Sequence, residues 1–233
     1  MHAAALALPT LCAVCHDWSR TRVCDDCLQR HAQPRPRCRG CALAVPAGVL
    51  RCGACLAAPP PWAQAVAAVD YAFPWHRLVT SLKFDAAIDL AAPMAALLAR
   101  AVLEAAAPRP DLVLPVPLSR ARLAERGMNQ AWELARRAAS ALGLRAWAPG
   151  LLRPVDTPHL ADLPRQARAA SIRGAFAIAP GASAALHGRA VALVDDVMTT
   201  GATAAEATRT LLAAGTSSVQ LWVFARTPAP GDE

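Results

Sequence analysis

The chain has almost no lysine, few aromatic residues and no long hydrophobic run, and each shortage limits what the protein can be. Lys83 is the only lysine, so arginine supplies all but one of the 24 basic residues. Aromatic residues make up 5% of the 233 residues, whereas hydrophobic residues make up 55% and charged residues 18%. This composition supports a packed core and excludes global disorder. No uncharged apolar run reaches the roughly 18 residues of a membrane span, so we expect no membrane insertion.

The first residues, "MHAAALALPTLC", do not read as a targeting segment. Their apolar part is short, no lysine or arginine precedes it, and the residue before Cys12 is not small. A secretory signal needs a basic start and a small-residue cleavage site. We therefore expect a cytoplasmic protein.

Cysteine is absent after residue 55, and the eight cysteines before it form four C-x2-C pairs: Cys12/Cys15, Cys24/Cys27, Cys38/Cys41 and Cys52/Cys55. In a reducing cytosol disulfides are the weaker interpretation. Pairs at this spacing favour tetrahedral zinc held by four thiolates, with two pairs closing each site. Four pairs therefore predict two zinc ions.

Pairing in sequence order would place the first four cysteines on one zinc and the last four on the other, which keeps the closed loops short. An interleaved pairing remains an alternative. Either arrangement gives complete four-thiolate sites, which leave no position open for a reactive water and are therefore structural.

The basic charge shrinks once zinc is counted. The formal net charge is +7 and the sequence pI about 9.4. Residues 1–57 carry seven arginines and three aspartates, and a zinc ion with four thiolates carries about −2. The corrected charge of this part is near zero, so the pI indicates nucleic-acid binding only weakly. Arg35, Arg37 and Arg39 could still form a local basic patch.

The three prolines in "LAAPPPWAQ" predict a stiff spacer after the last cysteine pair. We expect a double zinc-ribbon module at residues 1–57, a linker at 58–65 and a larger domain at 66–233. The larger domain alternates β-like stretches (66–73, 111–118, 189–194 and 219–224) with apolar residues at helical spacing (90–101, 128–142 and 204–211). This alternation predicts an α/β fold with a parallel sheet and helices on both faces. Trp132 and Trp222 fit its core.

The stretch "VALVDDVMTTGAT" (191–203) combines a buried strand, two adjacent acids and a loop of glycine and threonines. The carboxyl end of such a strand is a ligand-binding position in open α/β sheets, and a following helix favours an anion. Gly201 permits a positive φ, and Thr199, Thr200 and Thr203 add hydroxyl donors, which suits a monophosphate. The stretch is not a Walker loop, because it has no lysine beside its threonines. It is not a dinucleotide fingerprint either, because the G-x-G-x-x-G pattern is absent.

Asp195 and Asp196 precede this phosphate loop and would repel a bare phosphate. Two partners suit them: the vicinal hydroxyls of a sugar, or a magnesium ion. A sugar phosphate offers the hydroxyls and the phosphate together. An N-cap aspartate is the structural alternative, but it accounts for one acid and not for two.

The same stretch resembles the ribose 5-phosphate signature of type I phosphoribosyltransferases. That resemblance implies a ligand, phosphoribosyl pyrophosphate (PRPP) or ribose 5-phosphate, bound with magnesium. It assigns the ribose hydroxyls to Asp195 and Asp196 and the rest of the site to the residues that follow, namely Val197, Met198, Thr199, Thr200, Gly201, Ala202 and Thr203.

The block "PVPLSRARLAERGMNQAWELA" (115–135), with "LKF" at 82–84 and the cysteine pairs upstream, resembles the ComF family. Those proteins join an amino-terminal zinc ribbon to a phosphoribosyltransferase domain. The resemblance implies a pyrophosphate loop with three candidates, Leu118, Ser119 and Arg120, and with Arg126 nearby. Helix capping is the alternative for Arg126 and Asn129.

One segment departs from the family pattern. Many relatives have a glutamine near residue 160 and an asparagine at the position of Ser171, and both are missing in 157–173. Two functions remain open. The chain could be an enzyme that transfers a phosphoribosyl group to an unknown nitrogen acceptor. It could instead be a non-catalytic factor that binds PRPP or single-stranded DNA during DNA uptake, together with proteins of the competence machinery.

Overall fold

The computed structural model describes residues 9–156 and 171–229. Its centre is a four-stranded sheet in the order β3 (Gln64–Asp70), β8 (Ser218–Arg226), β7 (Ala190–Met198) and β4 (Leu112–Pro115). All three pairings are parallel. Residues 157–170, which make up most of the altered segment and include Arg165 and Arg168, lie outside the described residues. The structure therefore does not test what the departure from the family pattern means for the site.

Side chains on the two central strands alternate between two hydrophobic cores. On β7, Ala192 and Val194 join one core, while Val191 and Leu193 join the other. Period-two burial of this kind means that both faces of the sheet are covered. Trp222 on β8 is fully buried, as its sequence pattern predicts.

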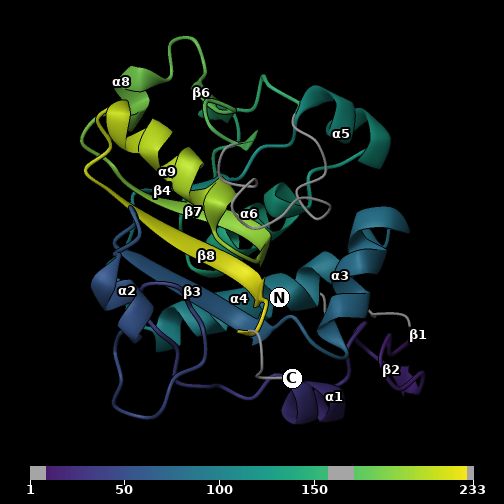
Figure 1. Ribbon diagram of the computed structural model, residues 1–233. Coiled ribbons are helices and arrows are strands. Elements are labelled where there is room, and N and C mark those ends of the chain that lie inside the picture. The colour runs from purple at the N-terminus through teal and green to yellow at the C-terminus, as the bar shows by residue number, and fades with distance from the viewer. Residues whose placement is uncertain (1–8, 157–170, 230–233) are drawn as a thin grey trace, which may run out of the picture.

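Helices cover both faces of the sheet, which confirms the predicted fold class (Figure 1). The helices α4 (Ala91–Glu104) and α6 (Gln130–Ala141) pack together on one face. On the other face lie α9 (Ala202–Ala213) and the small hairpin β5 (Leu151–Leu152) and β6 (Ala177–Ile178). Three shorter helices complete this part of the chain: α3 (Trp75–Phe84), α5 (Arg120–Arg126) and α8 (Ser183–Leu186).

Two details differ from the sequence prediction. The strand expected to end at Val194 continues to Met198, so both aspartates lie within β7. Glu133, which the helical spacing of the apolar residues in 128–142 places on the opposite, polar face of α6, is buried, and Arg136 and Arg137 both pair with its carboxylate. These two partners offset the cost of burying the charge.

The cysteine-rich part packs against the sheet domain. It contains β1 (Thr10–Leu11), β2 (Trp18–Ser19), α1 (Asp25–His31) and α2 (Gly53–Ala57). The indole Nε1 of Trp75 donates to the His31 carbonyl at 2.7 Å, and Arg22 pairs with Asp89 at 2.7 Å. Asp89 lies in η1 (Ile88–Leu90), just before α4. Strand β3 begins within the predicted linker, and the division into a module, a linker and a domain remains a prediction.

None of the helices in residues 9–156 and 171–229 has the length and apolar character that crossing a bilayer requires.

Candidate functional site

The predicted phosphate loop connects the end of β7 to the start of α9. Gly201 is the N-cap of α9 and has φ of 79°, the left-handed conformation that glycine adopts most readily. The helix after it is 12 residues long. Its first backbone amides therefore face the loop with the positive end of the helix dipole, which favours an anion.

A cavity of about 390 Å³ opens beside this loop at the carboxyl ends of the strands. Asp195, Asp196 and the loop residues Thr199 and Thr203 are part of its lining. The remaining lining is cationic in part and includes Lys83, Arg122, Arg126 and Arg153. The cavity lining thus combines two carboxylates, a phosphate-type loop and several cations, a set of groups that suits a ligand with both hydroxyls and anionic groups.

The two aspartates differ in their surroundings. Lys83 Nζ lies 3.2 Å from Asp196 Oδ2. Asp195 Oδ1 accepts a hydrogen bond from the Asp196 amide at 2.9 Å. Burial, and next the charge of Asp196, raise the pKa of Asp195 to about 7, although Lys83 and Arg153 act in the opposite direction. The charge of Asp195 is therefore sensitive to pH near neutrality.

Arg153 is a site residue that the sequence did not reveal. It follows β5, is only 6% exposed, and its guanidinium lies 5.7 Å from the centre of the Phe176 ring. Burial, and next the positive charge of Arg122, lower the pKa of Arg153. The carboxylates of Asp195 and Asp156 act in the opposite direction on its pKa. Because Arg153 also lines the cavity, its charge can contribute to binding an anionic ligand there. A single arginine in "LLRPV" carries no motif that could have identified it.

The candidates for the pyrophosphate loop do not all reach the cavity. Leu118 and Arg126 line it. Ser119 instead caps α5, accepting from the Arg122 amide, and donates to Asp156 Oδ1 at 2.5 Å. Arg120 is exposed and outside the cavity lining.

Asn129 caps a helix, as the structural alternative for it predicts. Its Oδ1 accepts from the Trp132 amide at the start of α6, and its Nδ2 donates to the Val116 carbonyl at 3.1 Å. It lines the cavity as well. Arg126 does not cap a helix through its side chain. Its guanidinium lies 5.3 Å from the Phe84 ring centre, and its Nη1 is 3.4 Å from Gln130 Oε1.

The eight cysteines form two groups in sequence order rather than interleaved. Within each group the sulfur atoms all lie within 4.8 Å of one another. Cys15 and Cys24 sulfurs are 3.7 Å apart in the first group, as are Cys41 and Cys52 sulfurs in the second. Each group could hold one metal ion, and four thiolates with no disulfide among them are the ligand set of a structural zinc site.

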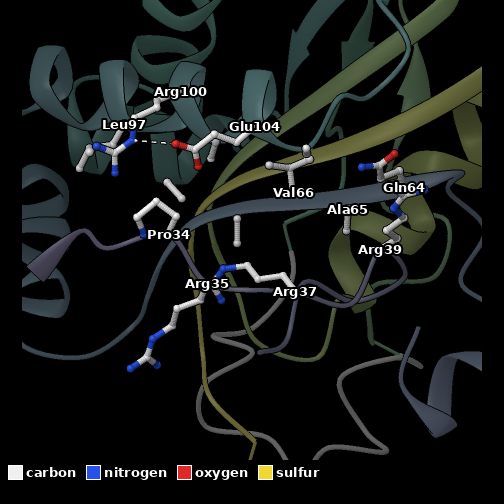
Figure 2. Close-up of a pocket in the computed structure, with 14 residues that line it drawn as sticks. Pro34, Arg35, Arg37, Arg39, Gln64, Ala65, Val66, Leu97, Arg100 and Glu104 are labelled. Atoms are coloured by element: carbon white, nitrogen blue, oxygen red, sulfur yellow. Dashed lines mark ion pairs between the residues drawn. The ribbon is translucent and has the colours of Figure 1, made fainter. Parts of the chain in front are cut away.

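A second pocket, of about 280 Å³, lies between β3, α4 and the segment 34–39 (Figure 2). Its lining includes alanines of β3 and α4 and four arginines, Arg35, Arg37, Arg39 and Arg100. Arg35 and Arg37 both pair with Asp70, and Arg100 pairs with Glu104. Because two acids pair with only three of the four arginines, the arginine-lined pocket carries a net positive charge.

Comparisons with known proteins find similar chains in enteric and other bacteria. DNA utilization protein YhgH of Salmonella typhi is 35% identical over 232 residues, which are 95% of this chain and 99% of the relative. The YhgH protein of Escherichia coli K12 is 32% identical over the same shares. Competence protein F of Haemophilus influenzae is 30% identical over 212 residues, 89% of this chain and 92% of that protein. No family profile matches the chain.

Among solved structures, the allosteric regulatory enzyme of purine biosynthesis matches 57% of this chain and 26% of its own, with 22% identity and a TM-score of 0.38. The glutamine PRPP amidotransferase of Bacillus subtilis matches 58% of this chain and 27% of its own, with 17% identity and a TM-score of 0.38.

Proposed function

The chain belongs to the ComF family, together with DNA utilization protein YhgH and competence protein F, and we propose that its site binds PRPP with magnesium. The observation that carries the proposal is the placement of Asp195 and Asp196 on the strand that leads into the loop at Gly201. Both acids line a cavity that several cations also line.

Each part of the cavity suits one part of PRPP. The amides at the start of α9 and the threonine hydroxyls would hold the 5-phosphate. Asp195 and Asp196 would accept hydrogen bonds from the ribose 2- and 3-hydroxyls. The pyrophosphate and its magnesium would lie toward Arg126 and Arg153, whose positive charges balance the anion.

The reaction that this arrangement suits is phosphoribosyl transfer to a nitrogen nucleophile. The bond between C1 of the ribose and the pyrophosphate oxygen breaks, pyrophosphate leaves with the bonding electrons, and a C1–N bond forms. The nucleophile loses a proton to water. The residues described above would position the ribose and neutralise the leaving group, with magnesium bound to the pyrophosphate.

A calorimetric titration with PRPP and magnesium tests the binding. Each hydrogen bond to a charged group contributes about 1.5–3 kcal/mol, so the double variant Asp195→Asn/Asp196→Asn should bind at least about 100-fold more weakly. Asp111→Asn is the matched control, because Asp111 lies at the opposite end of β7, where it accepts from the Ala190 amide. Equal affinity of the double variant and the wild type would refute the site.

Release of pyrophosphate from PRPP in the presence of single nucleobases and amines tests the transfer. Release that depends on one acceptor would establish an enzyme and its substrate together. Tight binding without release in any mixture would leave PRPP as a bound effector and would contradict the transfer step.

We also propose that each cysteine group holds one structural zinc ion. Each group presents four sulfurs to one point and leaves no ligand position for water. Metal analysis of the purified full chain should then find two zinc ions per molecule, and a preparation that is folded without metal would disprove the assignment.

The arginine-lined pocket favours a second function, binding of single-stranded DNA through its phosphates. The pocket in Figure 2 is lined by more arginines than acids, and Arg39 is exposed there. Arg35 and Arg39 would contact phosphates of the bound strand. In the variant Arg35→Ala/Arg39→Ala, the slope of log K against log salt concentration for oligothymidine should therefore become less negative by the amount expected for about two lost phosphate contacts. Arg209→Ala on α9, where Arg209 is exposed and pairs with Glu206, is the control. An unchanged slope would show that DNA phosphates do not bind in this pocket.

A further inference from the structure

The second cysteine group is joined to the phosphate loop by two buried side chains. Arg226, the last residue of β8, is 8% exposed. Its Nε donates to the Cys41 carbonyl at 2.7 Å, and its Nη1 donates to the carbonyls of Met198 at 3.0 Å and Thr199 at 2.7 Å. One guanidinium therefore holds the C-x2-C turn at one end and the start of the loop at the other.

Trp62 makes the second connection. It is 6% exposed, and its Nε1 donates to the Gly40 carbonyl at 2.6 Å. Its ring lies under the loop: a Cβ placed on Gly201 would be 3.0 Å from the ring. Gly40 itself packs against the fourth ligand of the group, because a Cβ there would lie 2.7 Å from the Cys55 sulfur. The carbonyls of Gly40 and Cys41 thus belong to a turn whose shape depends on how the four sulfurs are held.

We propose that Arg226 and Trp62 are positioning residues that transmit the shape of the Cys38–Cys41 turn to the phosphate loop, so that metal loading of the second cysteine group sets how well the loop holds a phosphate. The binding half of this inference rests on the proposed function of the loop. The first cysteine group is not expected to have this role, because within the described residues the hydrogen bonds and the ion pair of its surroundings lead to α3, η1 and α4 and not to the loop.

The test has a ligand-free readout, hydrogen exchange of the amides in residues 199–203, and a second readout, the Kd for PRPP. Arg226→Lys keeps the charge but cannot bridge the separate carbonyls in one rigid plane. We expect it to speed exchange at the loop at least about tenfold and to weaken PRPP binding by a similar factor. Metal content should stay at the wild-type value, which separates a moved loop from a lost metal.

Trp62→Phe is the second variant, since it keeps a ring under Gly201 and removes the donor to Gly40. It should change both readouts in the same direction by a smaller factor. Trp18→Phe is the matched control, because Trp18 is 76% exposed on β2. Unchanged exchange and affinity in both Arg226→Lys and Trp62→Phe would overturn the proposal.

The two cysteine groups contain a matched pair for the metal itself. Cys24 and Cys52 are both the N-cap of a short helix, with φ and ψ of −71° and 160° for Cys24 and −72° and 160° for Cys52. Cys24→Ser and Cys52→Ser should each lose metal from one group, and only Cys52→Ser should loosen residues 199–203. Equal loosening in both would refute the coupling. If the wild type does not bind PRPP, the proposed function fails, while the exchange comparison still decides the coupling.

Discussion

Lys83 Nζ lies 3.2 Å from Asp196 Oδ2, so the only lysine of the chain pairs with the second of the two adjacent site carboxylates. Both side chains are largely buried, with exposed fractions of 19% and 12%. The lysine offsets part of the repulsion between Asp195 and Asp196 and lowers the pKa of Asp195 against burial. In the absence of ligand it is therefore the main counter-charge that keeps two acids together.

We expect PRPP binding to weaken as the pH falls below 7. The pKa of Asp195 is about 7, and the ribose hydroxyls or a magnesium ion require the ionised carboxylate. Below that pKa a proton must leave before the ligand binds, so the affinity should fall by up to about tenfold per pH unit. Calorimetric titrations between pH 5.5 and pH 8.5, in about 0.5-unit steps, would locate the midpoint.

Lys83→Gln should move this midpoint to higher pH, because the lysine lowers the pKa of Asp195. Lys83→Arg keeps the positive charge and should leave the midpoint close to that of the wild type. A midpoint that is the same in Lys83→Gln and Lys83→Arg would show that charge at this position does not control Asp195.

Through Asp195, the free energy of unfolding should decrease as the pH rises, whereas the affinity for PRPP should increase. A carboxyl whose pKa is raised from 3.8 to about 7 on folding stabilises the fold when protonated, and this contribution is lost as the pH rises through 7. Asp195→Asn removes the ionised form and should therefore raise the Tm at pH 8. Because Asp195 keeps partial contact with solvent, we expect a gain of about 1–2 kcal/mol, which corresponds to about 2–8 °C.

The gain should shrink toward pH 5, where the wild-type carboxyl is protonated as well. Thermal unfolding of both proteins at the two pH values measures the difference. A constant difference between the Tm values would mean that the asparagine acts through packing or hydrogen bonding and not through the charge.

The site could be predicted from the sequence where it depends on local pattern, and not where it depends on distant segments. The loop at Gly201 and the cysteine pairs are contiguous motifs whose geometry follows from a few residues. Arg153 and Lys83 reach the same cavity from β5 and α3, and only the folded sheet brings them together. The order of the strands likewise follows from long-range pairing, so Arg226 could not be linked to Cys41 from their positions 185 residues apart.

Removing the metal should unfold the cysteine-rich part before the sheet domain. Structural zinc contributes on the order of 10 kcal/mol per site, and this part contributes few buried apolar residues of its own. With a strong chelator we expect two zinc ions to be released and fast hydrogen exchange in residues 9–57. Exchange at the sheet core, such as the amide of Leu193, should stay slow. Uniform protection after complete zinc loss would contradict this view.

Gly201→Ala should impair the phosphate loop for two separable reasons. An alanine at φ of 79° costs about 1 kcal/mol in any setting. At Gly201 its Cβ would also lie 3.0 Å from the Trp62 ring, so the loop or the ring would have to move. We therefore expect a clear loss of PRPP affinity, about tenfold or more if the displacement removes one charge-assisted hydrogen bond.

Gly181→Ala isolates the first of these reasons. Gly181 has φ of 78°, almost the same as Gly201, but no atom lies within 4 Å of the Cβ that it would gain. It precedes α8 and lies outside the cavity lining. This variant should lose about 1 kcal/mol of stability and keep the wild-type affinity for PRPP. Thermal unfolding and calorimetry of both variants measure the two effects. If Gly201→Ala loses no more affinity than Gly181→Ala, the close contact between Gly201 and Trp62 does not support the loop.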